Sequence, residues 1–158
     1  MKNLKEYIVE GIFDVDDNID NIDKSIKDQI KQFLKNNFIG ASSCKISNKP
    51  NTNGKYEVSS YGSIVVKNKK ITSLTNNLFV LTTVGGDFFC RHCKSLKSLK
   101  GSPEKVGGNF SCSWCDSLKS LEGAPKEVGG FFGCSECGIA FTIDDVKEVS
   151  NVKGKINI

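Results

Sequence analysis

The stretch from residue 84 to residue 141 reads VGGDFFCRHCKSLKSLKGSPEK, then VGGNFSCSWCDSLKSLEGAPKE, then VGGFFGCSECGIAF. Val84, Val106 and Val128 open three copies of one unit at a spacing of 22 residues. A Gly-Gly pair, a phenylalanine and a Cys-x-x-Cys pair recur at the same spacing. A fixed period in the twenties predicts a solenoid, because a unit of this size buries its apolar side only by stacking on its neighbours.

Alternation within the unit predicts which side chains face the inside of the stack. Phe110 and Cys112 are expected to point inward from a short strand, and Leu118 and Leu121 to fill the returning arm. Cys115 is expected at a ladder position, where a small polar side chain bonds the backbone of the turn. The glycines are expected at the corners of each unit.

The six cysteines of the repeats have two interpretations, a structural ladder and a zinc site. Cys90, Cys93, Cys112, Cys115, Cys134 and Cys137 are expected to form a structural ladder without a cofactor. Zinc is the alternative, because 18 residues separate the Cys90–Cys93 pair from the Cys112–Cys115 pair, which is a spacing seen in four-cysteine zinc sites. The ladder is favoured because three equal pairs do not divide into four-ligand sites and because the pairs share the period of the apolar markers.

The residues between the paired cysteines are the candidate binding face. Alternation places Arg91, His92, Ser113, Trp114, Ser135 and Glu136 on the outside of the stack. Exposed tryptophan and arginine are favoured anchors of protein interfaces. His92 is the only histidine, and no repeated Asp or Asn stands beside it, so we expect a surface residue rather than half of a Cys-His pair.

The flanking segments are expected to cap the solenoid. Residues 14–41 show an apolar stripe at helical spacing and predict an amphipathic helix, with Asp16 or Asp17 as the N-cap and Asn36, Asn37 and Gly40 as stop signals. Residues 42–83 predict a β-hairpin (42–60) and a degenerate first repeat. Residues 141–158 predict a C-terminal cap with a short helix at 144–149 and a strand at 155–158.

Composition limits the classes of function. The chain has 158 residues, a net charge of +4, 38% hydrophobic and 25% charged residues, which is typical of a globular protein. The net charge is small, so we do not expect a nucleic-acid partner. Neither an apolar run of membrane-spanning length nor a signal peptide is found, so a membrane partner and secretion are not expected. No nucleophile–base pair, phosphate-binding loop or carboxylate dyad is readable, so we expect no enzyme.

The repeat resembles short repeat proteins of the SLEGAPKEVGG type, which are found in phages and bacteria. The resemblance covers residues 61–140, and it implies a leucine-rich-repeat-like β-solenoid. Some of those relatives carry Asn where Cys115 stands, which supports the ladder interpretation of this cysteine.

Residues 1–13 resemble the capsid-targeting leader of tailed bacteriophages. The matching residues are Met1, Lys2, Glu6, Tyr7, Ile8 and Glu10. The resemblance implies cleavage between Glu10 and Gly11 and a protein located in the virion or in the host bacterial cytoplasm.

These observations together predict an α+β chain, with an N-terminal amphipathic helix and a β-solenoid of 22-residue repeats at 84–140. The expected function is a non-enzymatic protein–protein interaction module, virion-associated or acting early in infection. Its expected partner is a host protein or another virion protein. Two alternatives stay open: a zinc-stabilised nucleic-acid-binding protein and an architectural virion component.

Overall fold

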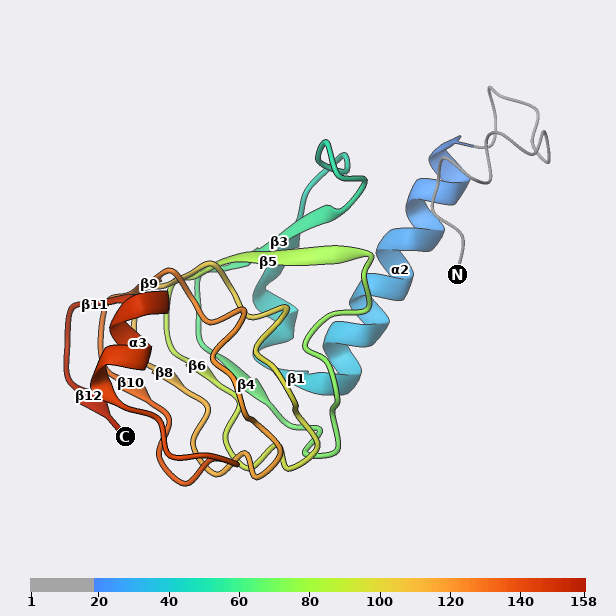
Figure 1. Cartoon of the computed structure of the whole chain (residues 1–158). Helices are drawn as coiled ribbons and strands as arrows, with labels where there is room; N and C mark the ends of the chain where they lie inside the picture. The colour runs from blue at the N-terminus through green and yellow to red at the C-terminus, as the bar shows by residue number, and fades with distance from the viewer. Residues whose placement is uncertain (1–18) are drawn as a thin grey trace.

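The computed structural model describes residues 19–158, which form a β-solenoid of about four turns with one helix at each end (Figure 1). The solenoid and the 22-residue repeat agree with the sequence prediction. The leader-like segment 1–13, the Glu10–Gly11 cleavage site and the candidate N-caps Asp16 and Asp17 lie outside the described residues. Within residues 19–158, neither helix is both long enough and apolar enough to span a bilayer.

Two sheets run along the solenoid. Each turn of the solenoid, called a coil below, contributes one short strand to each sheet. Sheet A contains, in spatial order, β1 (Phe38–Ile39), β4 (Ile64–Val66), β6 (Phe88–Phe89), β8 (Phe110–Ser111), β10 (Phe132–Gly133) and β12 (Ile156–Asn157). Sheet B contains β2 (Cys44–Ile46), β3 (Tyr56–Ser60), β5 (Phe79–Val84), β7 (Lys105–Val106), β9 (Glu127–Val128) and β11 (Asn151–Val152). Strands β1 and β2 are antiparallel to their neighbours, and all other pairs are parallel.

The strand register follows the repeat. In sheet A, Phe88 pairs with Phe110, and Phe110 pairs with Phe132. In sheet B, Val106 pairs with Val84 on one side and with Val128 on the other. The residues before each Gly-Gly pair form the strands of the second sheet, sheet B. The repeat pattern alone does not predict this sheet, because a strand of two residues is too short to show alternation.

The Gly-Gly corners join the two sheets and allow the coils to approach closely. A Cβ atom on Gly107 would collide with the carbonyl oxygen of Gly85, and one on Gly129 would collide with the carbonyl oxygen of Gly107. The N–H of Gly129 donates to the carbonyl of Val106 at 2.9 Å. Only glycine fits these positions, because backbone stacks directly on backbone there.

The residues directly after the corner glycines form a row of hydrogen bonds between polar side chains and the backbone of the next coil, along the edge of sheet A. The Asp87 N–H donates to Ser63 Oγ at 2.9 Å. In the next coils, the Asn109 N–H donates to Asp87 Oδ1 at 2.7 Å, and the Phe131 N–H donates to Asn109 Oδ1 at 2.9 Å. These side chains satisfy backbone donors that the short strands leave unpaired.

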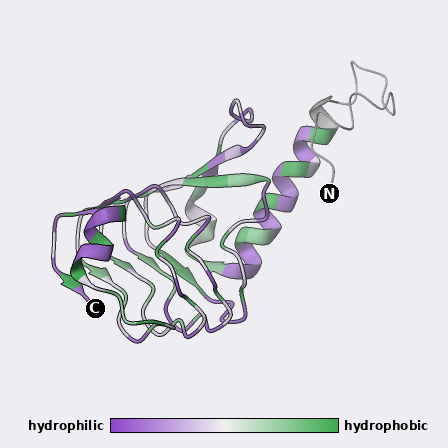
Figure 2. Ribbon diagram, in the orientation of Figure 1, coloured by the Kyte–Doolittle hydropathy of each residue, from purple (hydrophilic) through white to green (hydrophobic). Residues whose placement is uncertain are grey.

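The inside of the solenoid is apolar, as the alternation predicts. Phe88, Phe110 and Phe132 are fully buried and stack along the axis, with ring centroids 6.0 Å apart in the first pair and 4.8 Å apart in the second. Leu118 is fully buried and Leu121 is 5% exposed. Figure 2 shows hydrophobic residues on the strands and along one stripe of the N-terminal helix.

The N-terminal end is closed by a helix and a hairpin. Helix α2 (Ile19–Asn37) ends near the predicted stop signals, and Gly40 follows it with a φ of 85°. Ile30 and Leu34 are buried against the first coil. The predicted hairpin forms between β2 and β3. The degenerate repeat also forms, since Ile64 in β4 pairs with Phe88 in β6.

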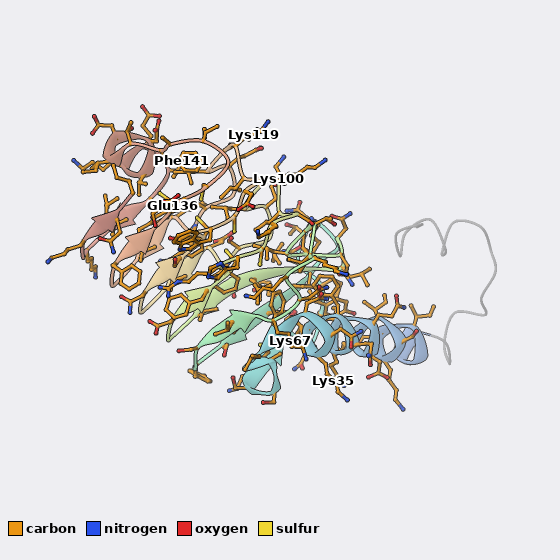
Figure 3. The ribbon with its side chains drawn as sticks, turned by 90° about the horizontal axis from the view of Figure 1, so that it is seen from below. Lys35, Lys67, Lys100, Lys119, Glu136 and Phe141 are labelled. Carbon is orange, nitrogen blue, oxygen red and sulfur yellow. The ribbon has the colours of Figure 1, made fainter. Side chains whose placement is uncertain are left out.

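The C-terminal end carries a second helix. Helix α3 (Ile143–Val149) begins with a capping box, in which the Asp145 N–H donates to Thr142 Oγ1 at 3.2 Å and the Thr142 N–H donates to Asp145 Oδ2 at 2.7 Å. Phe141 lies beside α3, at the end of the solenoid away from α2 (Figure 3). Strand β12 follows at Ile156–Asn157, inside the predicted range.

We expect Gly129→Ala to lower the free energy of unfolding by about 1–3 kcal/mol, because the new methyl group must push two coils apart. Urea denaturation monitored by circular dichroism measures the change. Gly62→Ala is the matched control, because its Cβ would lie 3.7 Å from the nearest side-chain atom, Ser43 Oγ. Equal unfolding midpoints for the two variants would contradict the corner model.

Candidate interaction surface

Each Cys-x-x-Cys pair forms a turn at the end of a sheet A strand. The third residue of each turn has a left-handed backbone, with a φ of 59° at His92, 64° at Trp114 and 53° at Glu136. Glycine and asparagine favour this conformation, and for a bulky residue it costs about 1–2 kcal/mol. The fold therefore holds three large side chains in strained positions at the same corner of successive coils.

The second cysteine of each later pair bonds to the coil before it. Cys115 Sγ donates to the carbonyl of Cys90 at 3.1 Å, and Cys137 Sγ donates to the carbonyl of Cys112 at 3.3 Å. In the first coil, Lys69 Nζ donates to the corresponding carbonyl of Val66 at 2.7 Å. The two thiol bonds run between adjacent coils, so the thiols connect the coils in series, whereas the Lys69 bond lies within its own coil.

Burial and mutual contacts set the ionisation of the thiols. Burial raises the pKa of Cys90 well above its usual range, and raises the pKa of Cys134 to about 12. A hydrogen bond with Cys93, followed by burial, raises the pKa of Cys115, while the same bond lowers the pKa of Cys93.

The same arrangement recurs one coil later. A hydrogen bond with Cys137 and burial together raise the pKa of Cys112, and that bond lowers the pKa of Cys137. Cys44, the cysteine outside the repeats, has its pKa raised by burial. The interior cysteines are therefore mainly neutral thiols, which serve as small apolar residues with a weak donor.

The zinc alternative needs four thiolates that converge on one point. Among residues 19–158, no group of three or more Cys, His, Asp or Glu side chains has an arrangement that fits a metal ion.

We expect native mass spectrometry of the chain refolded with zinc to show the mass of the protein alone. A mass excess of one zinc that a chelator removes would contradict the ladder and favour the zinc-stabilised nucleic-acid-binding alternative.

The predicted outward residues divide into two groups. Trp114 is 48% exposed, and His92 and Glu136 are also exposed at the turns. Ser113 is only 7% exposed, and Arg91 and Ser135 are half-buried. The sequence predicts Ser113 on the outside of the stack but does not predict its burial, since its hydroxyl lies within a row of serines on the face of sheet A. Ser111 Oγ donates to Ser113 Oγ at 3.2 Å, and Ser135 Oγ donates to Ser113 Oγ at the same distance.

Two phenylalanines complete this surface, and the sequence reasoning missed them. Phe89 and Phe131 stack across the outside of sheet A, with ring centroids 6.4 Å apart. The Arg91 guanidinium lies 4.4 Å from the Phe89 ring and 5.8 Å from the Phe131 ring. Alternation carries the missing signal, because each of these residues neighbours an inward phenylalanine and must face outward.

The turns extend this surface along the stack. His92 and Trp114 stack with their ring centroids 5.7 Å apart and an interplanar angle of 19°. We call Phe89, Arg91, His92, Trp114 and Phe131 the aromatic–arginine patch. The patch spans three coils, and intramolecular stacking holds its side chains before any ligand arrives.

Comparison with known proteins adds no relative. No protein-family model matches the chain, and no curated protein or solved structure is significantly similar to it.

We expect the free energy of unfolding to fall as pH rises from about 8.5, where an unfolded cysteine ionises, towards 12. The reason is that burial holds Cys134 protonated in the folded chain up to a pKa of about 12, so the unfolded state loses its proton first. Urea denaturation at several pH values measures the slope. The Cys134→Ala variant is the control, and its slope should be shallower. Identical slopes for the two proteins would contradict this assignment.

Proposed function

We propose that this chain is a non-enzymatic protein–protein interaction module and that the aromatic–arginine patch is its contact surface. One observation carries the proposal: Trp114 is held in a left-handed conformation at φ 64° while 48% of its surface is exposed. A strained, bulky, exposed residue costs stability, and such strain concentrates at functional positions. Tryptophan and arginine are also the residue types enriched in the hot spots of protein interfaces.

The rigidity of the patch supports the same proposal. A partner that binds mobile side chains must immobilise them, at a cost of about 0.5–1.5 kcal/mol each. Here His92 already stacks on Trp114, and Arg91 already stacks on Phe89. Less conformational entropy is therefore lost when a partner binds.

The biological setting is a further part of the proposal. We propose that the chain belongs to the leucine-rich-repeat-like proteins of the SLEGAPKEVGG type and that it is packaged in a phage virion or acts early in infection. The leader resemblance at residues 1–13 supports this setting. The partner is then a host protein or another virion protein.

We expect Trp114→Ala to abolish the capture of a specific partner from host lysate or from disrupted phage particles. Loss of one hot-spot tryptophan costs about 2 kcal/mol or more of binding free energy. Ile143→Ala is the matched control, because Ile143 is 43% exposed and lies on α3 instead of the patch. Quantitative mass spectrometry of the captured proteins compares the two variants with the wild type. A partner retained equally by Trp114→Ala would place the contact elsewhere on the chain.

We expect peptide mass spectrometry of purified phage particles to find this chain with its first residue at Gly11. Such a start is expected because the leader resemblance places the cleavage after Glu10. An intact Met1 in particles, at a fixed copy number, would instead favour the architectural alternative. Absence from the particles would contradict the virion assignment and leave the interaction module without this setting.

A further inference from the structure

We propose that the aromatic–arginine patch binds an acidic protein segment, in which a carboxylate pairs with Arg91 and a neighbouring apolar side chain contacts Trp114. This inference rests on the proposed function and specifies the chemistry of the partner.

The guanidinium of Arg91 is fixed in place and has unused hydrogen-bonding capacity. It lies 4.4 Å from the Phe89 ring, so its plane is held against an aromatic face. Within residues 19–158, its N–H groups donate to no other residue, and its Nε is buried without a partner. A planar guanidinium matches the two oxygens of a carboxylate, which its terminal N–H groups can bind.

Positive charge gathers around this arginine. Lys67 occupies the position of Arg91 in the preceding coil, because each lies three residues after the register partners Ile64 and Phe88. Lys69 Nζ donates to the carbonyl of Arg91 at 2.8 Å, which brings a third cation to the same corner. Figure 3 shows Lys67 near α2 and Glu136 nearer α3, so the row of turns runs from a basic end to an acidic end.

Three other surface lysines of the repeats differ, because they have carboxylate partners. Each of these pairs joins equivalent positions of neighbouring coils: Lys94–Asp116 at 3.4 Å, Lys100–Glu122 at 2.9 Å and Lys105–Glu127 at 2.8 Å. Within the described part of the chain, Arg91 and Lys67 take part in no such ion pair, so the basic end of the patch keeps a net positive charge. A negatively charged group on a partner would therefore be attracted to this end of the patch.

An acidic protein segment fits these observations better than a single-stranded nucleic acid. Nucleic-acid binders offer free aromatic faces on which bases stack. Here the faces of Phe89 and Phe131 contact Arg91, and one face of Trp114 contacts His92.

Selection from a random library of short linear peptides, displayed on cells and panned against the full chain, tests the proposal. We expect the enriched peptides to be rich in Asp and Glu next to an apolar or aromatic residue. Fluorescence anisotropy should show that Arg91→Gln weakens the best peptide by at least about tenfold, a change that truncation of one charged partner readily produces. Lys119→Gln removes the same charge from an exposed loop lysine and should leave the affinity unchanged.

The outcomes separate this inference from the proposed function. Enriched peptides that lack acidic residues but lose affinity with Trp114→Ala would overturn the inference and keep the interaction surface. Affinity that survives both Arg91→Gln and Trp114→Ala, or a failure to enrich any peptide, would overturn both. An oligothymidine that binds more tightly than the best peptide would also overturn the inference.

A readout on the unmodified chain guards against misfolding of the Arg91→Gln variant. Arginine Nε–H groups give separate signals in ¹H–¹⁵N spectra. Adding the best acidic peptide to the wild-type chain should shift the signals of Arg91 Nε–H and of Trp114 Nε1–H. An Arg91 signal that does not move when the peptide saturates the chain would overturn the inference.

Discussion

Contact between successive backbones at the Gly-Gly corners controls the spacing of the whole molecule. The carbonyl of Gly85 occupies the space that a side chain on Gly107 would need, and the carbonyl of Gly107 does the same for Gly129. This close stacking places residues 22 positions apart side by side, so Phe88, Phe110 and Phe132 form one continuous core. Each coil contacts mainly its neighbours, and the terminal coils therefore need caps.

The same register produces the features that we connect with function. The cysteine thiols reach carbonyl groups of the preceding coil only because the turns lie one above another. Phe89 and Phe131 come from coils that are two apart. The positions in register with Phe89 in the next two coils are the small Ser111 and Gly133, and the Phe131 ring lies over Gly133 towards Phe89. The contact surface is thus a property of the stack, and no single repeat contains it.

The sequence predicts the periodic parts of this fold well. The 22-residue period, the inward Phe110 and Leu118, the N-terminal hairpin and the short C-terminal helix all follow from spacing and alternation. The second sheet was not predicted, because strands such as β7 contain only two residues and their partners lie in other repeats. Backbone pairing between coils decides their conformation, and a single repeat does not show it.

The candidate site was predicted in part. The positions of His92, Trp114 and Glu136 on the outside follow from their place between the cysteines. The burial of Ser113 and the stacking of Arg91 on Phe89 do not follow from the sequence pattern. Both depend on contacts between side chains across the outer face of sheet A. The assignment of the partner, the virion setting and the leader at residues 1–13 stays a prediction.

Nuclear Overhauser contacts between the rings of Phe89 and Phe131 test this account most directly. The two residues are 42 positions apart in sequence, and their rings approach only if three coils stack in the described register with both side chains on the outer face of sheet A. We predict cross-peaks between the two rings and from the Arg91 side chain to each of them. A spectrum in which these assigned signals show no mutual contacts would contradict both the register and the surface that depends on it.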